Sequence, residues 1–356
     1  MNENFMKEKP VFPLLVSMAL PMVISMLVNS LYNIVDSFFV AQISEDAMTA
    51  LSLVYPVQNF VNAVAIGFGI GLNAVISYYL GAGDKKAAGC AATQGLALTM
   101  LHAVILTIGS LLVIERFLRM FSSSETVIDL GVRYSRIIFL FTIAIMANLY
   151  FEKVFQAVGR MKVTMTGMMI GCIVNIILDP LLIFGIGPFP ALKVTGAAIA
   201  TIIAQMVVTL LFLFFASQDQ ILFHHIHLLQ APDSKKASEI FRLGLPSCLQ
   251  SLVFTGISMT IARLVAGYGD AAVAVQKVGA QIESISWMTS DGFASAVNSF
   301  IAQNHGAGKE DRIHAGYRSA LKIVLPWGLF CTILLVCFPT PIFKIFITEP
   351  DVIPMG

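Results

Sequence analysis

The sequence predicts an all-α membrane protein with two pseudo-symmetric six-helix bundles, the second of them incomplete. Three observations support this: an apolar composition, a series of long apolar segments and an internal repeat. Of the 356 residues, 57% are hydrophobic and 12% are charged, whereas about a quarter are charged in a soluble domain. The mean hydropathy is +0.82. The net charge of only +1 argues against nucleic acid as a partner.

Nine segments are each apolar over the roughly 20 residues that a helix needs to cross a bilayer. The first is too long for a signal peptide, so we expect it to be retained. Lys and Arg concentrate in the N-terminal tail and in the loops that follow every second span, which places the N-terminus in the cytoplasm and the protein in the inner (cytoplasmic) membrane. The expected spans are 13–41, 49–80, 89–114, 128–157, 163–186, 194–217, 239–267, 273–303 and 314–338.

The chain matches itself without a gap when it is shifted by 225 residues. Leu20-Pro21 then falls on Leu245-Pro246, and Gly81-Ala82-Gly83 falls on Gly306-Ala307-Gly308. Six spans separate the copies, so the repeat is a parallel duplication of a six-helix unit. We expect an N-terminal lobe over 1–217, a cytoplasmic linker over 218–238, and over 239–356 a second lobe with three helices and the start of the next. Twice 225 predicts a full protein of about 450 residues.

Two acidic residues lie inside expected spans, Asp36 in the first and Asp179 in the fifth. Each would cost about 2.5–3.5 kcal/mol at mid-bilayer, so each requires a reason. Asn175 shares a helix face with Asp179, and Thr201 with the carbonyl of Ala197 lies on the next span. If these faces meet, they form an all-oxygen cluster for a hard cation or a proton. Alternatively, Asp179 pairs locally and Asp36 reaches the outer interface.

Other polar groups in the spans are weaker signals. Asp291 is a candidate for attracting a cation in the second lobe, and Glu283 could either do so or neutralise Lys277. Pro21 removes one helical hydrogen bond and predicts either a static bend or a hinge. The sequence contains no hydrolase constellation and no ATP-binding motif. We therefore expect no enzyme, no cofactor and no metal beyond Na⁺.

Several of these motifs resemble the multidrug and toxic compound extrusion (MATE) family. They are residues 20–21, the helix of Asp36, residues 81–83 with 306–308, and residues 156–162; residues 175–180 followed by 196–201 are similar to the prokaryotic DinF-like branch. The resemblance implies an antiporter that exports amphipathic, often cationic, compounds by alternating access against H⁺ or Na⁺. It implies that the cation binds at Asp36, Asn175, Asp179, Thr201 and Ala197, and that Pro21 is a hinge. Expected at the substrate cavity are Tyr32, Asn148, Gln156, Glu283 and Asp291.

A flippase for a lipid-linked oligosaccharide or polyprenyl pyrophosphate, on a related fold, is the main alternative. The cavity of such a flippase should present several cationic side chains. Here the candidates are Arg263 and Lys277, and the acidic candidates in the spans outnumber them. A channel or scaffold is a third class. Phe254 stands where the NorM-like branch carries a glutamate, which argues against a sodium site in the second lobe. We expect a monomer whose partners are membrane lipid and small organic cations or other amphipathic drugs.

Overall fold

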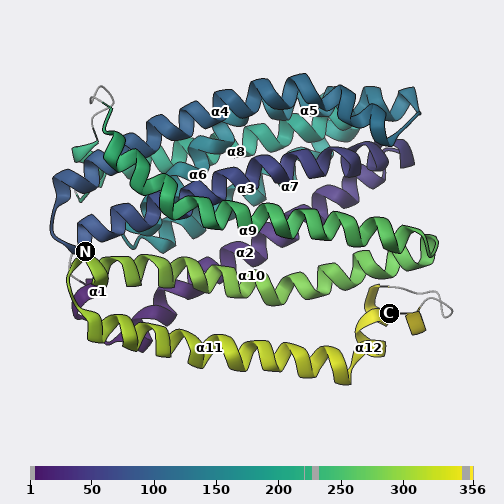
Figure 1. The fold of residues 1–356 in the computed structure, drawn as a ribbon. Coiled ribbons are helices and arrows are strands. Elements are labelled where there is room, and N and C mark those ends of the chain that lie inside the picture. The colour runs from purple at the N-terminus through teal and green to yellow at the C-terminus, as the bar shows by residue number, and fades with distance from the viewer. Residues whose placement is uncertain (1–4, 220, 227–231, 347–352, 356) are drawn as a thin grey trace.

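The computed structural model describes residues 5–219, 221–226, 232–346 and 353–355, and every regular element in these ranges is helical. The long helices run side by side along one direction, and the N-terminus lies at one end of the bundle (Figure 1). The elements are α1 Phe5–Glu8, α2 Val11–Ala41, α3 Glu45–Gly81, α4 Lys85–Phe121, α5 Glu125–Leu140, α6 Thr142–Ala157, α7 Met161–Phe184, α8 Val194–Ser217, η1 Phe223–His225, α9 Ser234–Ala266, α10 Asp270–Gly306, α11 Glu310–Cys337, α12 Pro339–Phe346 and η2 Ile353–Met355.

Seven helices of the described part are long and apolar enough to cross a membrane, and α5 with α6 makes an eighth as a pair bent by 49°. The expected span 128–157 is therefore broken, at Phe141. At this position the Thr142 hydroxyl donates to the carbonyl of Phe139 at 2.8 Å. The expected span 273–303 forms α10, which has 37 residues but is less apolar than these helices, because it carries charged residues and many Ser, Gln and Asn side chains. The chain is a multi-pass membrane protein.

The short connections between the spans end at helix N-termini that are capped by side chains. The Ser44 hydroxyl accepts from the backbone N–H of Ala47 at 3.1 Å, and the Asp84 carboxylate accepts from Ala87 N–H at 2.8 Å. Each bond satisfies one of the free N–H groups in the first turn of a helix. Asp233 caps α9 in the same way, so that α9 begins at Ser234, inside the segment expected as the linker.

The duplication is visible in the helix bounds. We call α2–α8 lobe 1 and α9–α12 lobe 2. Both ends of α10 lie 225 residues after those of α3, and the first residue of α11, Glu310, lies 225 after Lys85, which begins α4. The side chains of Asn73 and Asn298, which are equivalent in the repeat, hydrogen-bond to each other at 2.8 Å. The pseudo-twofold axis that relates the lobes therefore passes close to this pair.

Glycines let the backbones of the two lobes approach closely. A Cβ at Gly67 of α3 would lie 2.6 Å from the Cα of Cys248 in α9, and a Cβ at Gly292 of α10 would lie 2.7 Å from the backbone nitrogen of Val23 in α2. Because Gly67 and Gly292, and also Val23 and Cys248, are repeat equivalents, the same contact is made twice. Such close crossings depend on small residues.

These contacts lie in the half of the bundle that carries the N-terminus, which we call the closed end (Figure 1). Beyond Cys248, towards the other end, the large apolar side chains of α9 are exposed: Leu249, Val253, Phe254, Ile257, Met259, Ile261 and Leu264. The lobes also touch in this half, where the Asn59 side chain of α3 donates to the Thr255 hydroxyl of α9 at 2.7 Å, but the close glycine crossings described above lie at the closed end.

Candidate functional site

Asp36 of α2 and Asp179 of α7 meet inside lobe 1, where these two helices pack along each other. Their carboxyl groups lie within hydrogen-bonding reach of each other. The Asp179 side chain is fully buried. One oxygen of each carboxyl, Oδ1, is buried and has no hydrogen-bond partner in the described structure. Neither carboxylate is in a salt bridge with a described residue.

Asn175 and Thr201 extend the carboxyl pair towards α8. In the amide orientation that satisfies both its ends, Asn175 donates to Asp179 Oδ2 at 2.8 Å and accepts from the backbone N–H of Thr201 at 3.3 Å. The hydroxyl groups of Thr201 and Tyr32 are 3.5 Å apart. Ala197 is buried one turn before Thr201. The spacing of four residues between Asn175 and Asp179 puts both side chains on the same face of α7.

Two residues that the sequence did not single out also belong to this cluster. Tyr134 of α5 is buried and lies within electrostatic range of both Asp36 and Asp179. Its hydroxyl accepts from the Gln58 side chain of α3 at 3.4 Å. Gln58 could have been suspected as an amide inside an apolar span. Tyr134 carries no comparable signal, because only the packing of α5 brings it to the pair.

The residues expected at the substrate cavity do not gather around the pair, with the exception of Tyr32. Asn148 donates to Gln205, which joins α6 to α8. Gln156 is buried; it donates to Glu152 Oε1 at 2.7 Å and accepts from Lys153 Nζ at 3.3 Å. The Lys153–Glu152 ion pair, at 2.8 Å, needs such partners because charges taken out of water must be neutralised and hydrogen-bonded.

The expected polar residues of lobe 2 lie elsewhere. Glu283 and Asp291 are exposed on α10, and Asp291 is within electrostatic range of Lys153 in lobe 1. The side chain of Lys277 lies outside the part that the structure describes. Phe254 is exposed and its ring centroid lies 6.4 Å from that of Trp287.

Pro21 does not interrupt α2, which continues as one helix to Ala41. The carbonyl of Pro21 accepts from the Ser25 hydroxyl at 2.8 Å. Fifteen residues separate Pro21 from Asp36, about 22 Å along the helix axis. A hinge at Pro21 would therefore act on the carboxyl pair from four turns away.

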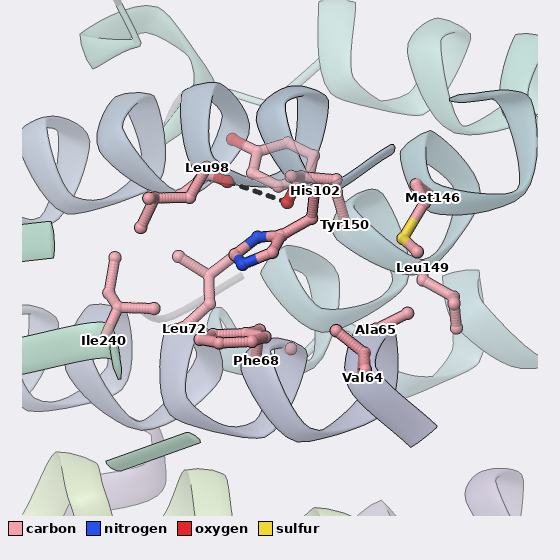
Figure 2. A pocket seen from close by; sticks show the side chains of 13 residues that line it. Val64, Ala65, Phe68, Leu72, Leu98, His102, Met146, Leu149, Tyr150 and Ile240 are labelled. Carbon is pink, nitrogen blue, oxygen red and sulfur yellow. Dashed lines mark hydrogen bonds between the residues drawn. The ribbon is translucent and has the colours of Figure 1, made fainter. Parts of the chain in front are cut away.

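A separate pocket in lobe 1 lies between α3, α4 and α6, with Ile240 of α9 at its margin (Figure 2). The His102 ring points across it and stacks on Phe68, with 4.2 Å between centroids. The Thr99 hydroxyl is satisfied by the carbonyl of Gly95 at 2.7 Å. The lining is otherwise almost entirely apolar and does not include the carboxyl pair, so this pocket offers no group that would replace Asp36 or Asp179 in binding a cation.

Two like helical lobes in a membrane, one with a buried carboxyl pair, define a membrane transporter. The chain belongs to the MatE family, which it matches over residues 21–181 and 246–356, one segment in each lobe. Members of this family are transporters, and the chain is not an enzyme. The family and the all-α membrane fold expected from the sequence are thereby confirmed.

Named relatives cover most of the chain. It is 29% identical to a "FAD transporter" of Shewanella oneidensis, over 97% of this chain and 76% of that protein. It is 26% identical to "Multidrug export protein MepA" of Staphylococcus aureus, over 99% of this chain and 77% of the relative. A solved structure of a multidrug resistance MATE family transporter in an outward-facing conformation superimposes with a TM-score of 0.91, at 26% identity, over 100% of this chain and 79% of that one.

Proposed function

We propose that the protein is an antiporter that exports amphipathic, cationic organic compounds by alternating access, driven by H⁺ or Na⁺. The contact between Asp36 and Asp179, each with a buried oxygen that has no hydrogen-bond partner among the described residues, is the observation that supports the coupling ion. The membership of the MatE family and the similarity to a multidrug export protein support the export of drug-like compounds.

The carboxyl pair needs a cation to be stable. Two like charges about 4 Å apart repel by about 4 kcal/mol at an effective dielectric constant of about 20. A bound proton or Na⁺ removes this repulsion, and Na⁺ would find further oxygens on Asn175 and Thr201. Carboxylate, amide and hydroxyl oxygens are the ligands that hard cations prefer. The cluster thus has the chemistry of an ion site that is occupied and emptied in turn.

Ion binding would drive export if the two lobes change their relative position between occupied and empty states. A ligand shifts such an equilibrium by the difference of its affinities for the two conformations. The bias of Lys and Arg towards the loops at the closed end supports a cytoplasmic N-terminus. In this orientation the close glycine contacts between the lobes lie on the cytoplasmic side, and the exposed apolar side chains in the second half of α9 face outwards.

The test is transport by the purified full chain in proteoliposomes. Ethidium is the organic cation, and FAD is included because one relative is named a FAD transporter. We expect ethidium movement when a pH gradient or a Na⁺ gradient is imposed, and none in its absence. Ethidium movement that ignores both gradients would contradict the antiport, and gradient-driven transport of FAD alone would contradict the cationic substrate. Gradient-independent movement of a lipid-linked pyrophosphate would favour the flippase.

A further inference from the structure

The segment that precedes the first span, residues 5–9, lies between the two lobes at the closed end. Its helix α1 has four residues, too few to be stable alone. Phe5 and Met6 are nevertheless buried, with 8% and 0% of their surface exposed. Contacts with the rest of the protein must therefore hold the segment in place. Figure 1 shows α1 at the end where α10 and α11 meet.

Side chains of lobe 2 hold the segment by hydrogen bonds to the backbone carbonyl groups of the segment. Arg312 of α11 donates to the carbonyls of Met6 at 2.9 Å and Lys9 at 2.8 Å. Asn304 of α10 donates to the carbonyl of Met6 at 3.2 Å. Lys309 donates to the carbonyl of Lys7 at 2.9 Å. Three of these four bonds have a charged donor, which makes them stronger than neutral ones.

Lobe 1 contacts the same segment from the other side. Gly159, in the turn between α6 and α7, has a φ of 80°, which favours glycine. A Cβ at this position would collide with the side chains of Phe5 and Met6. Lys7 Nζ is 3.5 Å from the carbonyl of Gly81, the last residue of α3. Since the segment also continues into α2, it is part of lobe 1 and reaches across to lobe 2.

The repeat shows that this arrangement is reciprocal. The equivalent of Asn304 in lobe 1 is Tyr79, and its hydroxyl donates to Glu239 in the first turns of α9 at 2.9 Å. Lys236 of the same turns lies over the Tyr79 ring, 3.4 Å from its centroid. The end of α3 is thus held by the start of the first span of lobe 2, and the end of α10 by the segment before the first span of lobe 1.

We propose that residues 5–9 are a latch that holds the lobes together at the closed end, and that the segment detaches from lobe 2 each time this end opens. The bonds from Arg312, Asn304 and Lys309 join different lobes, so they break when the lobes separate. This inference rests on the alternating access of the proposed function. Its first test does not use a substrate and can therefore fail or succeed independently of transport.

The first test weakens the latch and measures access to the closed end. The reporter is Ser299→Cys, at a fully buried position of α10, in a chain whose five cysteines are replaced by alanine. Arg312→Gln removes the charged donor, and the control Arg318→Gln makes the same change at an exposed position of the same helix. Each hydrogen bond from a charged group contributes substantially to the stability of the closed arrangement. We therefore expect thiol labelling to become roughly tenfold faster in Arg312→Gln and to stay unchanged in Arg318→Gln. Equal rates in all three proteins would overturn the latch.

The second test joins the segment to one lobe or the other and leaves Arg312 in place. Lys7→Cys with Lys309→Cys is linked across the lobes by a reagent that dithiothreitol cleaves. Lys7→Cys with Ala82→Cys is linked within lobe 1 and is the matched control. Ethidium transport should stop only in the pair linked across the lobes, and should return after reduction. Unchanged transport by the protein linked across the lobes would show that the segment does not need to detach.

Discussion

Replacing Asp36 by Asn tests the carboxyl pair directly. The substitution keeps the shape of the side chain and removes one of the two negative charges that meet in lobe 1. Asp179 keeps its bond from Asn175, at 2.8 Å. What changes is the electrostatic need of the site for a cation.

The magnitude follows from the geometry. At about 4 Å and an effective dielectric constant of about 20, one charge pair contributes about 4 kcal/mol. A bound cation loses an attraction of this size, which corresponds to about a thousandfold in affinity. We expect gradient-driven ethidium transport to fall below about a tenth of the wild-type rate. The protein should not become less stable, because the substitution removes a repulsion between buried groups.

The assay is the proteoliposome transport described above, together with thermal unfolding in detergent. Asp129→Asn is the matched control, because Asp129 is 56% exposed and pairs with Arg133 at 2.9 Å on the surface of α5. Such exposed pairs contribute little, so this variant should transport normally. Wild-type transport by Asp36→Asn would refute the reasoning. A lower unfolding temperature of Asp36→Asn would also refute it, since the loss would then come from misfolding.

Three further predictions concern other positions. Thr201→Val removes a hydroxyl oxygen from the cluster, and should slow transport driven by Na⁺ more than transport driven by H⁺; equal effects under the two gradients would exclude Thr201 as a Na⁺ ligand. Gly306→Ala puts a Cβ against the carbonyl of Tyr78 and should destabilise the fold by about 1–3 kcal/mol, whereas Gly328→Ala, with no described heavy atom within 4 Å, should not lower the unfolding temperature. Backbone N–H groups of Lys236 and Lys235 lower the pKa of the Asp233 carboxyl; its stabilising effect is therefore present above the unfolded pKa of about 3.9 and lost at lower pH. Asp233→Ala should thus lower the unfolding temperature more near pH 7 than near pH 3, and a decrease that is equally large near pH 3 would contradict this.

Most helix ends could be located from the sequence to within a few residues, although α4 ends at Phe121 and not at residue 114. The segment expected over 273–303 is Asp270–Gly306 in the structure, and the repeat of 225 residues recurs in the helix bounds. The break at Phe141 could not be predicted, because neither a proline nor a glycine marks it in the sequence. The start of α9 was expected too late, because the cap at Asp233 was not recognised.

Asp36 and Asp179 could also be singled out from the chain alone, because a carboxylate in an apolar span is costly wherever its neighbours lie. Their partners were harder to predict. Tyr32 and Gln156 were both assigned to the substrate cavity; in the structure the Tyr32 hydroxyl lies 3.5 Å from that of Thr201, and Gln156 accepts from Lys153.

The sequence by itself determined that the chain crosses a membrane several times, which helices it forms and that the lobes are duplicates. These properties depend on the transfer of each segment into lipid and on residue identities at a constant spacing, which are local or can be read by direct comparison. Only the tertiary structure decided that Tyr134 approaches the carboxyl pair and that residues 5–9 bridge the lobes. Both depend on which faces meet between segments far apart in the sequence, such as Gly159 against Phe5 and Met6, and no local property of the sequence specifies such contacts.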